Sequence, residues 1–175
     1  MKILTPADYI QQPWANGRGT TTELLRIGTD PLLVLLSMAV VTEDGPFSLF
    51  PGIERNLTVL TGPGFRLQGD GLALDCTPLR PVAFAGDVAI RAVGTEGQPS
   101  TDFNVMTARS LPRPQVVAAG PGAEMPAGGL LALFALEPCR LSEARLGLHD
   151  LAITDGPVSV IAGRVLAIRL FGVAI

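Results

Sequence analysis

The sequence is poor in the residue types on which most metal and hydrolytic centres depend. Its 175 residues include one histidine, two cysteines and one tryptophan. Transition-metal sites in β-barrel enzymes usually combine two or three imidazoles with a carboxylate, so a single histidine argues against a metal centre. It also argues against a Ser-His-Asp triad, and no GxSxG segment is present. We therefore expect no metal and no other cofactor, and these motifs assign no catalytic residue.

Strong charge and long apolar runs are also missing. Charged residues make up 17% of the chain and the net charge is -3, which gives no basic surface for DNA or RNA. The longest apolar run, residues 31–41, is shorter than the roughly 20 residues of a membrane-spanning helix. Thr5, Pro6 and Asp8 interrupt any apolar core of a signal sequence. Cys76 and Cys139 lie outside any CxxC pattern and are expected to be buried free thiols. These features predict a cytoplasmic protein without nucleic-acid or membrane partners.

Glycine and proline, by contrast, are abundant, with 20 and 15 copies. The segments between them are short and rich in Val, Leu, Ile, Thr and Phe, which is typical of strands. Few windows of helical length remain, so the pattern predicts an all-β fold. The expected strands are residues 20–27, 32–41, 53–60, 64–68, 81–84, 88–93, 102–109, 130–136, 140–146, 158–161 and 165–171.

A change in composition divides the chain. Residues 110–129 are rich in proline and glycine, cannot form one regular element throughout, and are expected to be a connector. Residues 1–109 form the N-terminal part that carries the main motifs, and residues 130–175 supply the C-terminal strands. Residues 66–92 and 140–170 share a weak turn and strand rhythm. A duplicated half-barrel and a chance similarity both explain that rhythm at this stage.

The segment PWANGRGTTTEL, residues 13–24, contains the single tryptophan two residues before an Asn-Gly pair. Asn16 and Gly17 tolerate the positive φ angles of a two-residue hairpin turn. A turn requires neither an indole nor a guanidinium, yet Trp14 and Arg18 supply both. The segment is therefore either a plain turn or a turn that also forms a wall of a ligand site.

Strand alternation makes Arg55 unusual, because it shares a face with Ile53, Leu57 and Val59. A buried guanidinium needs an anionic partner, since an unpaired buried charge costs several kcal/mol. The alternative is that Arg55 lies at the open end of its strand and reaches water. In the segment DFNVM, residues 102, 104 and 106 share a face with polar character, which either lines a pocket or meets solvent.

Four linked segments carry a family resemblance: PWANGRGTTTEL, DGPFSLFPGIERNLTVLTGPGFRL, FAGD and DFNVMTAR. Their order and spacing resemble the HutD/Ves family of cupin-like proteins over residues 3–109, and the last third matches only in its β character. The resemblance implies an all-β, cupin-like double-stranded β-helix in a compact bicupin arrangement of two β-barrel halves. It also implies a metal-free bacterial protein, found beside histidine-utilisation genes or alone as a stress-associated protein.

The resemblance further implies binding of a small acid from histidine breakdown, such as urocanate or a formylglutamate-like compound, without an established enzymatic activity. Arg18 departs from the family pattern and is expected to adjust ligand preference. Carried over by position, the ligand-binding residues are Trp14, Asn16, Gly17, Phe47, Ser48, Arg55, Asp102, Asn104 and Met106.

Three classes of function remain open at this point. The first is a ligand-binding regulatory protein in which Arg55 pairs with a ligand carboxylate. The second is a metal-independent enzyme, an isomerase or hydrolase, with Asp102 as general base and Arg55 stabilising negative charge. The third is a protein-interaction module, and no large apolar surface stretch favours it. The sequence leaves a homodimer open as well.

Overall fold

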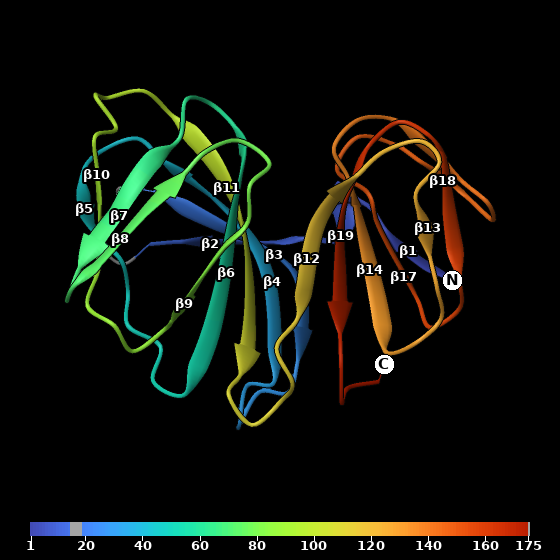
Figure 1. The fold of residues 1–175 in the computed structure, drawn as a ribbon, viewed down its shortest axis with the longest axis horizontal. Helices are drawn as coiled ribbons and strands as arrows, with labels where there is room; N and C mark the ends of the chain where they lie inside the picture. The colour runs from blue at the N-terminus through green and yellow to red at the C-terminus, as the bar shows by residue number, and fades with distance from the viewer. Residues whose placement is uncertain (15–18, 175) are drawn as a thin grey trace. The chain divides into compact units, whose positions relative to one another are not determined.

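The computed structural model describes residues 1–14 and 19–174, and it divides them into two compact units (Figure 1). One unit is Ile10–Ser110, and the other combines Met1–Tyr9 with Leu111–Ile175. In the described residues the only helical element is a single 3₁₀ turn, η1 (Pro6–Asp8), and all other regular elements are strands. The all-β prediction is therefore confirmed.

The unit Ile10–Ser110 contains two antiparallel sheets. The larger has the strand order β2-β3-β4-β11-β6-β9, and the smaller has the order β5-β10-β7-β8. Leu57 and Val59 from the larger sheet form one core cluster with Phe65, Leu67 and Ala92 from the smaller. The strands are β2 (Ile10–Pro13), β3 (Thr20–Ile27), β4 (Val34–Val41), β5 (Gly45–Pro46), β6 (Ile53–Thr61), β7 (Phe65–Gly69), β8 (Leu72–Cys76), β9 (Val82–Ala85), β10 (Arg91–Val93) and β11 (Ser100–Ala108).

The second unit also contains two sheets, with the orders β1-β17-β14-β19-β12 and β13-β18-β15-β16. The first strand of the chain pairs with β17, so residues near the N-terminus complete a sheet made otherwise from the last third. Leu131, Leu133, Leu141, Val160 and Val165 contribute to its buried core. The strands are β1 (Lys2–Leu4), β12 (Gln115–Ala119), β13 (Glu124–Met125), β14 (Leu130–Ala135), β15 (Cys139–Leu141), β16 (Arg145–Leu146), β17 (Leu151–Thr154), β18 (Val158–Ala162) and β19 (Val165–Leu170).

The described strands differ from the expected ones at several places. The predicted strand 140–146 is a hairpin of β15 and β16, because Ser142 and Glu143 interrupt it. Residues 110–129, expected as a connector, contain β12 and β13, and β12 pairs along its whole length with β19. Short strands such as β12 carry little local pattern, and their pairing with distant segments stabilises them. The strands that the sequence pattern did not predict are β1, β2, β5, β8, β12, β13 and β17.

Candidate functional site

Strand register gathers the polar residues of β11 and its neighbours on one face of the six-stranded sheet. Directly opposed residues of antiparallel strands point to the same face, so the pairing defines rows across the sheet. The first row joins Thr21, Ala39 and Asp102, and the second joins Glu23, Ser37, Asn104 and Leu57. The third row joins Leu35, Met106, Arg55 and Phe84. We call this surface of the sheet the polar face.

Arg55 lies at the centre of this arrangement and is only 6% exposed. Its guanidinium carbon lies 5.2 Å from the Phe47 ring centroid, 5.4 Å from that of Phe50 and 5.1 Å from that of Phe84. Aromatic faces attract a desolvated cation, so the three rings stabilise the charge in place of water. The expectation that Arg55 shares the apolar face of β6 is confirmed, and the alternative of an arginine reaching water is wrong.

The partners of Arg55 in the described residues are neutral oxygens. Its Nη2 donates to Asn104 Oδ1 at 2.7 Å, and its Nη1 donates weakly to the Ser48 carbonyl oxygen at 3.5 Å. Its Nε has no hydrogen-bond acceptor among the described residues. Burial lowers the pKa of Arg55 to about 10, while the charge of Asp102 opposes that shift. The guanidinium therefore has unused donor capacity in a place where leaving it unused is costly.

Asp102 and Asn104 form a second pair on the same strand. Asn104 Nδ2 donates to Asp102 Oδ1 at 2.6 Å, which fixes the amide so that its oxygen faces Arg55. Asp102 is 1% exposed, and burial raises its pKa to about 7 despite the opposing effects of Arg55 and Asn104. The polar side of DFNVM is thus buried, so the alternative in which it meets solvent is wrong.

Two further polar residues on this face escaped the sequence reasoning. Ser37 is 2% exposed and lies between Glu23 and Asn104 in the second row. Glu23 is 8% exposed and forms a bidentate ion pair with Arg26, with distances of 3.0 Å to Nε and 2.6 Å to Nη2. Ser37 could have been found as the one hydroxyl within the apolar run of residues 31–41. Glu23 belongs to the segment PWANGRGTTTEL but was not among the predicted site residues.

The other predicted site residues lie as follows. Trp14 donates from Nε1 to Thr21 Oγ1 at 2.8 Å, which attaches its indole to the first row of the polar face. Phe47 lies against Arg55, and Ser48 contributes its carbonyl oxygen to the guanidinium. Met106 is buried beside Leu35 and Ile53. Asn16 and Gly17, together with Arg18, lie outside the described residues.

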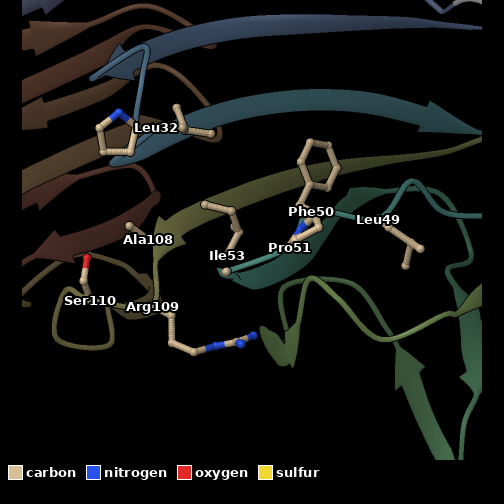
Figure 2. Close-up of a pocket in the computed structure, with 10 residues that line it drawn as sticks. Leu32, Leu49, Phe50, Pro51, Ile53, Ala108, Arg109 and Ser110 are labelled. Carbon is tan, nitrogen blue, oxygen red and sulfur yellow. The ribbon is translucent and has the colours of Figure 1, made fainter.

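A surface pocket of about 490 Å³ lies at the end of the strands beyond Arg55. Phe50 lines this pocket and also lies against the guanidinium, so the same residue borders both. Figure 2 shows the Arg109 side chain on the other side of Ile53 from Leu32 and Phe50, and Arg109 is held there by Glu54 and Asp87. None of the predicted ligand-binding residues lines this pocket. Its lining is Pro31, Leu32, Leu49, Phe50, Pro51, Gly52, Ile53, Ala108, Arg109 and Ser110.

Metal ligation and membrane insertion find no support in the part of the chain that the structure describes. No cluster of three or more His, Cys, Asp or Glu side chains there could hold a metal ion. His149 belongs to the other unit, where its ring stacks on Phe134 at a centroid distance of 5.4 Å. None of the described helices is long and apolar enough to cross a bilayer.

The polar face offers a cation, carboxylates, an amide and a hydroxyl. This combination suits recognition of a small polar molecule.

The architecture is that of a cupin-like protein. A cupin 2 conserved barrel domain protein from Leptotrichia buccalis superposes with a TM-score of 0.55 at 10% identity, covering 86% of this chain and 88% of that chain. The HutD family profile matches residues 6–157, and the chain belongs to the HutD family.

Two relatives place the chain within this family. HutD from Pseudomonas fluorescens SBW25 superposes with a TM-score of 0.87 at 30% identity and covers 97% of both chains. Protein Ves from Citrobacter koseri is 38% identical over 99 residues, which is 55% of this chain. That match spans about half of the Ves protein, 52% of its length. The predicted family is thereby confirmed, as is the predicted cupin-like fold.

Proposed function

We propose that this protein is a metal-free regulatory protein that binds a small carboxylic acid on the polar face, with Arg55 as the anion-binding residue. The observation that carries the proposal is a buried guanidinium with an unpartnered Nε and no ion pair to a described carboxylate. A carboxylate accepts hydrogen bonds from two guanidinium nitrogens at once, which would satisfy the missing acceptor. The ligand would enter as a counter-ion bonded directly to the guanidinium, which none of the described carboxylates is.

The neighbouring groups support binding of an acid of limited size. Asn104 and Ser37, in the row next to that of Arg55, offer directional hydrogen bonds. Phe47 and Trp14 would cover apolar atoms of the ligand. Asn16 and Gly17, which lie outside the described residues, are proposed to contact it as well. The Pseudomonas fluorescens relative was solved in a formate condition, and formate is the smallest carboxylate.

Family membership supports a link with histidine utilisation. Urocanate and formylglutamate, two acids of that breakdown route, are the ligands we propose to test first. Both cysteines are free and buried, which agrees with a cytoplasmic location where thiols stay reduced. A homodimer remains compatible with this proposal, which requires only one site in each chain.

A second candidate function is a metal-independent isomerase or hydrolase. The observation that favours it is Asp102, whose pKa of about 7 would let the carboxylate accept a proton near neutral pH. Arg55 would then stabilise negative charge that develops on the substrate. Binding alone needs no proton transfer, so the two functions differ in whether the ligand changes.

A thermal-shift screen followed by mass analysis tests both candidates. Formate, urocanate, N-formylglutamate and glutamate would each be added to the full chain, and the midpoint of unfolding measured. We expect urocanate or N-formylglutamate to raise the midpoint, because a ligand that binds only the folded state stabilises it. Recovery of the unchanged ligand after long incubation supports the regulatory protein, whereas a product of altered mass supports the enzyme. If none of the acids raises the midpoint, the binding proposal is wrong.

A further inference from the structure

We infer that the ligand carries an N–H donor as well as its carboxylate, and that Glu23 accepts this donor. The inference rests on the proposed function, because it assumes an acid held by Arg55. It adds a specificity-determining residue and narrows the ligand class. A monocarboxylate without an N–H group would bind to Arg55 but would leave Glu23 without a hydrogen-bond donor.

Glu23 and Arg55 lie on the same face of the sheet, separated by the strands β4 and β11. Register places Glu23 opposite Ser37, Ser37 opposite Asn104, and Asn104 within a hydrogen bond of the Arg55 guanidinium. Adjacent strands are about 4.8 Å apart, so the backbones at Glu23 and Asn104 are about 10 Å apart. The side chains of Glu23 and Arg55 both stand on this face. The separation between their charged groups therefore suits a molecule a few bonds longer than acetate.

A β-bulge holds Glu23 in this position. In a regular strand, residues three apart point to opposite faces, so Glu23 and Arg26 could not meet. The register of β3 shifts between Glu23 and Leu25, after which Arg26 lies opposite Leu35 and returns to the polar face. Arg26 can then bind both carboxylate oxygens of Glu23 from one side. Bulges commonly redirect a side chain next to a functional site.

Among the described residues, the ion pair with Arg26 leaves Glu23 with acceptor capacity. Each carboxylate oxygen can accept two hydrogen bonds, and Arg26 supplies one to each. The side chain of Arg26 is 35% exposed and that of Glu23 9%, so the cation lies towards solvent and the carboxylate towards the interior. The carboxylate of Glu23 lies at one end of the second row, and Arg55 lies beside the other end, in the third row. This arrangement matches a ligand with a donor at one end and an acid at the other.

The ligand class that fits is an acid joined through a short chain to an amide, an imidazole or another N–H group. A purely apolar end would cover the buried Glu23 carboxylate without replacing its hydrogen bonds to water, which is unfavourable. A site built to bind a donor rejects an analogue that lacks it far more strongly than a hydrophobic pocket rejects a small change in size.

Two planar acids of equal length and charge test this inference. Urocanate has an imidazole N–H, and trans-3-(2-furyl)acrylate has a furan oxygen in the corresponding ring. At pH 8, where an imidazole is neutral, both are monoanions. We expect calorimetry on the full chain to show urocanate binding at least about tenfold more tightly than furylacrylate. Equal affinities would overturn the inference.

The variant Glu23→Gln assigns that preference to a residue. We expect it to weaken urocanate binding several-fold and to change furylacrylate binding by less than about twofold. Glu54→Gln is the matched control, since Glu54 also pairs with an arginine, Arg109, but stands on the opposite face of the sheet. We expect that control to retain the full preference for urocanate.

A second variant covers the case in which Glu23→Gln does not fold. Glu23→Asp keeps the charge and shortens the side chain by one methylene, which withdraws the carboxylate from the ligand. The same loss of preference is expected, and a preference retained in either folded variant would exclude Glu23 as the acceptor. If both acids bind the parent equally and Arg55→Ala abolishes both, the proposed function survives and this inference fails. If neither acid binds the parent, this inference fails, and the proposed function fails with it only if formate, N-formylglutamate and glutamate do not bind either.

Discussion

Asn104 donates a hydrogen bond of 2.6 Å to Asp102, two residues earlier on β11, and both side chains are buried. The same amide accepts from Arg55 at 2.7 Å, so Asn104 connects the carboxyl group to the guanidinium. Asn104 can fill both roles only in one orientation of its amide. The protonation of Asp102 and the anion affinity of Arg55 are therefore coupled through a neutral side chain.

This coupling predicts a pH-dependent stability. Burial raises the pKa of Asp102 to about 7, above its ordinary value near 4, so the folded protein holds a proton that the unfolded chain releases. The contribution is fully present below about pH 4 and is lost as the pH rises to about 7. Relative to Asp102→Asn, the parent should lose at most about 1.4 kcal/mol of unfolding free energy per pH unit across that window.

Urea unfolding of parent and variant at pH 5, 6, 7 and 8 measures this difference. The unfolding free energy of Asp102→Asn should rise relative to that of the parent up to about pH 7, and the difference should then stay constant. Asp70→Asn changes an exposed aspartate and serves as the control with no such trend. A difference in unfolding free energy that does not change from pH 5 to pH 8 would show that Asp102 is ionised in the folded protein over this whole range.

Trp14 gives a direct optical test of the ligand site, because it is the only tryptophan of the chain. Its indole is attached to Thr21, in the same row as Asp102. Titration with N-formylglutamate, which does not absorb at the excitation wavelength, should give a saturable change in emission. Calorimetry on Trp14→Ala should show weaker binding but a smaller loss than Arg55→Ala, since mainly apolar contact is removed. Unchanged emission, with binding seen by calorimetry, would remove Trp14 from the site.

The purified protein is expected to carry no stoichiometric zinc, iron or manganese. Carboxylates, an amide and a hydroxyl line the polar face, and the single histidine belongs to the other unit. Elemental analysis after purification without chelators should therefore find far less than one of these metals per chain. About one equivalent of any of them, lost together with acid binding on dialysis against a chelator, would contradict the prediction.

The N-terminal residues are predicted to stabilise the unit formed mainly by the last third of the chain. Tyr9 donates from its hydroxyl to the His149 carbonyl oxygen at 2.6 Å, and β1 pairs with β17. Tyr9→Phe removes the hydroxyl and should lower the unfolding free energy by about 1 kcal/mol. Urea unfolding measures the change, with Tyr9→Leu as a larger perturbation that also removes the ring. An unaltered midpoint in Tyr9→Phe would mean that water replaces the hydroxyl fully.

Strand alternation predicted the part of the site that depends on local pattern. It placed Arg55 with Ile53, Leu57 and Val59, and it gave Asp102 and Asn104 a common face. It could not place Glu23, because the bulge after this residue breaks the alternation on which the reading depends. The pairing of the first strand with β17 is equally invisible locally, since it joins segments about 150 residues apart.

The aromatic surroundings of Arg55 were predictable only in part. Phe47 followed from the family resemblance, whereas Phe50 and Phe84 were not assigned to the site. Phe84 reaches the guanidinium because β9 pairs with β6 and sets it directly opposite Arg55. Phe50 comes from the segment before β6, where no periodic pattern exists to orient a side chain. Both contacts follow from tertiary structure.

The most direct test of the central claim is calorimetry of acid binding to Arg55→Ala, with Arg66→Ala as control. Arg66 is exposed and pairs with Asp75 on the neighbouring strand, so its loss should leave affinity unchanged. Truncating one side of a buried charge pair typically costs about 3 to 5 kcal/mol. With circular dichroism confirming the fold, we expect Arg55→Ala to bind urocanate or N-formylglutamate at least on the order of a hundredfold more weakly than the parent. A folded Arg55→Ala that binds the same acid as tightly as the parent would contradict the account.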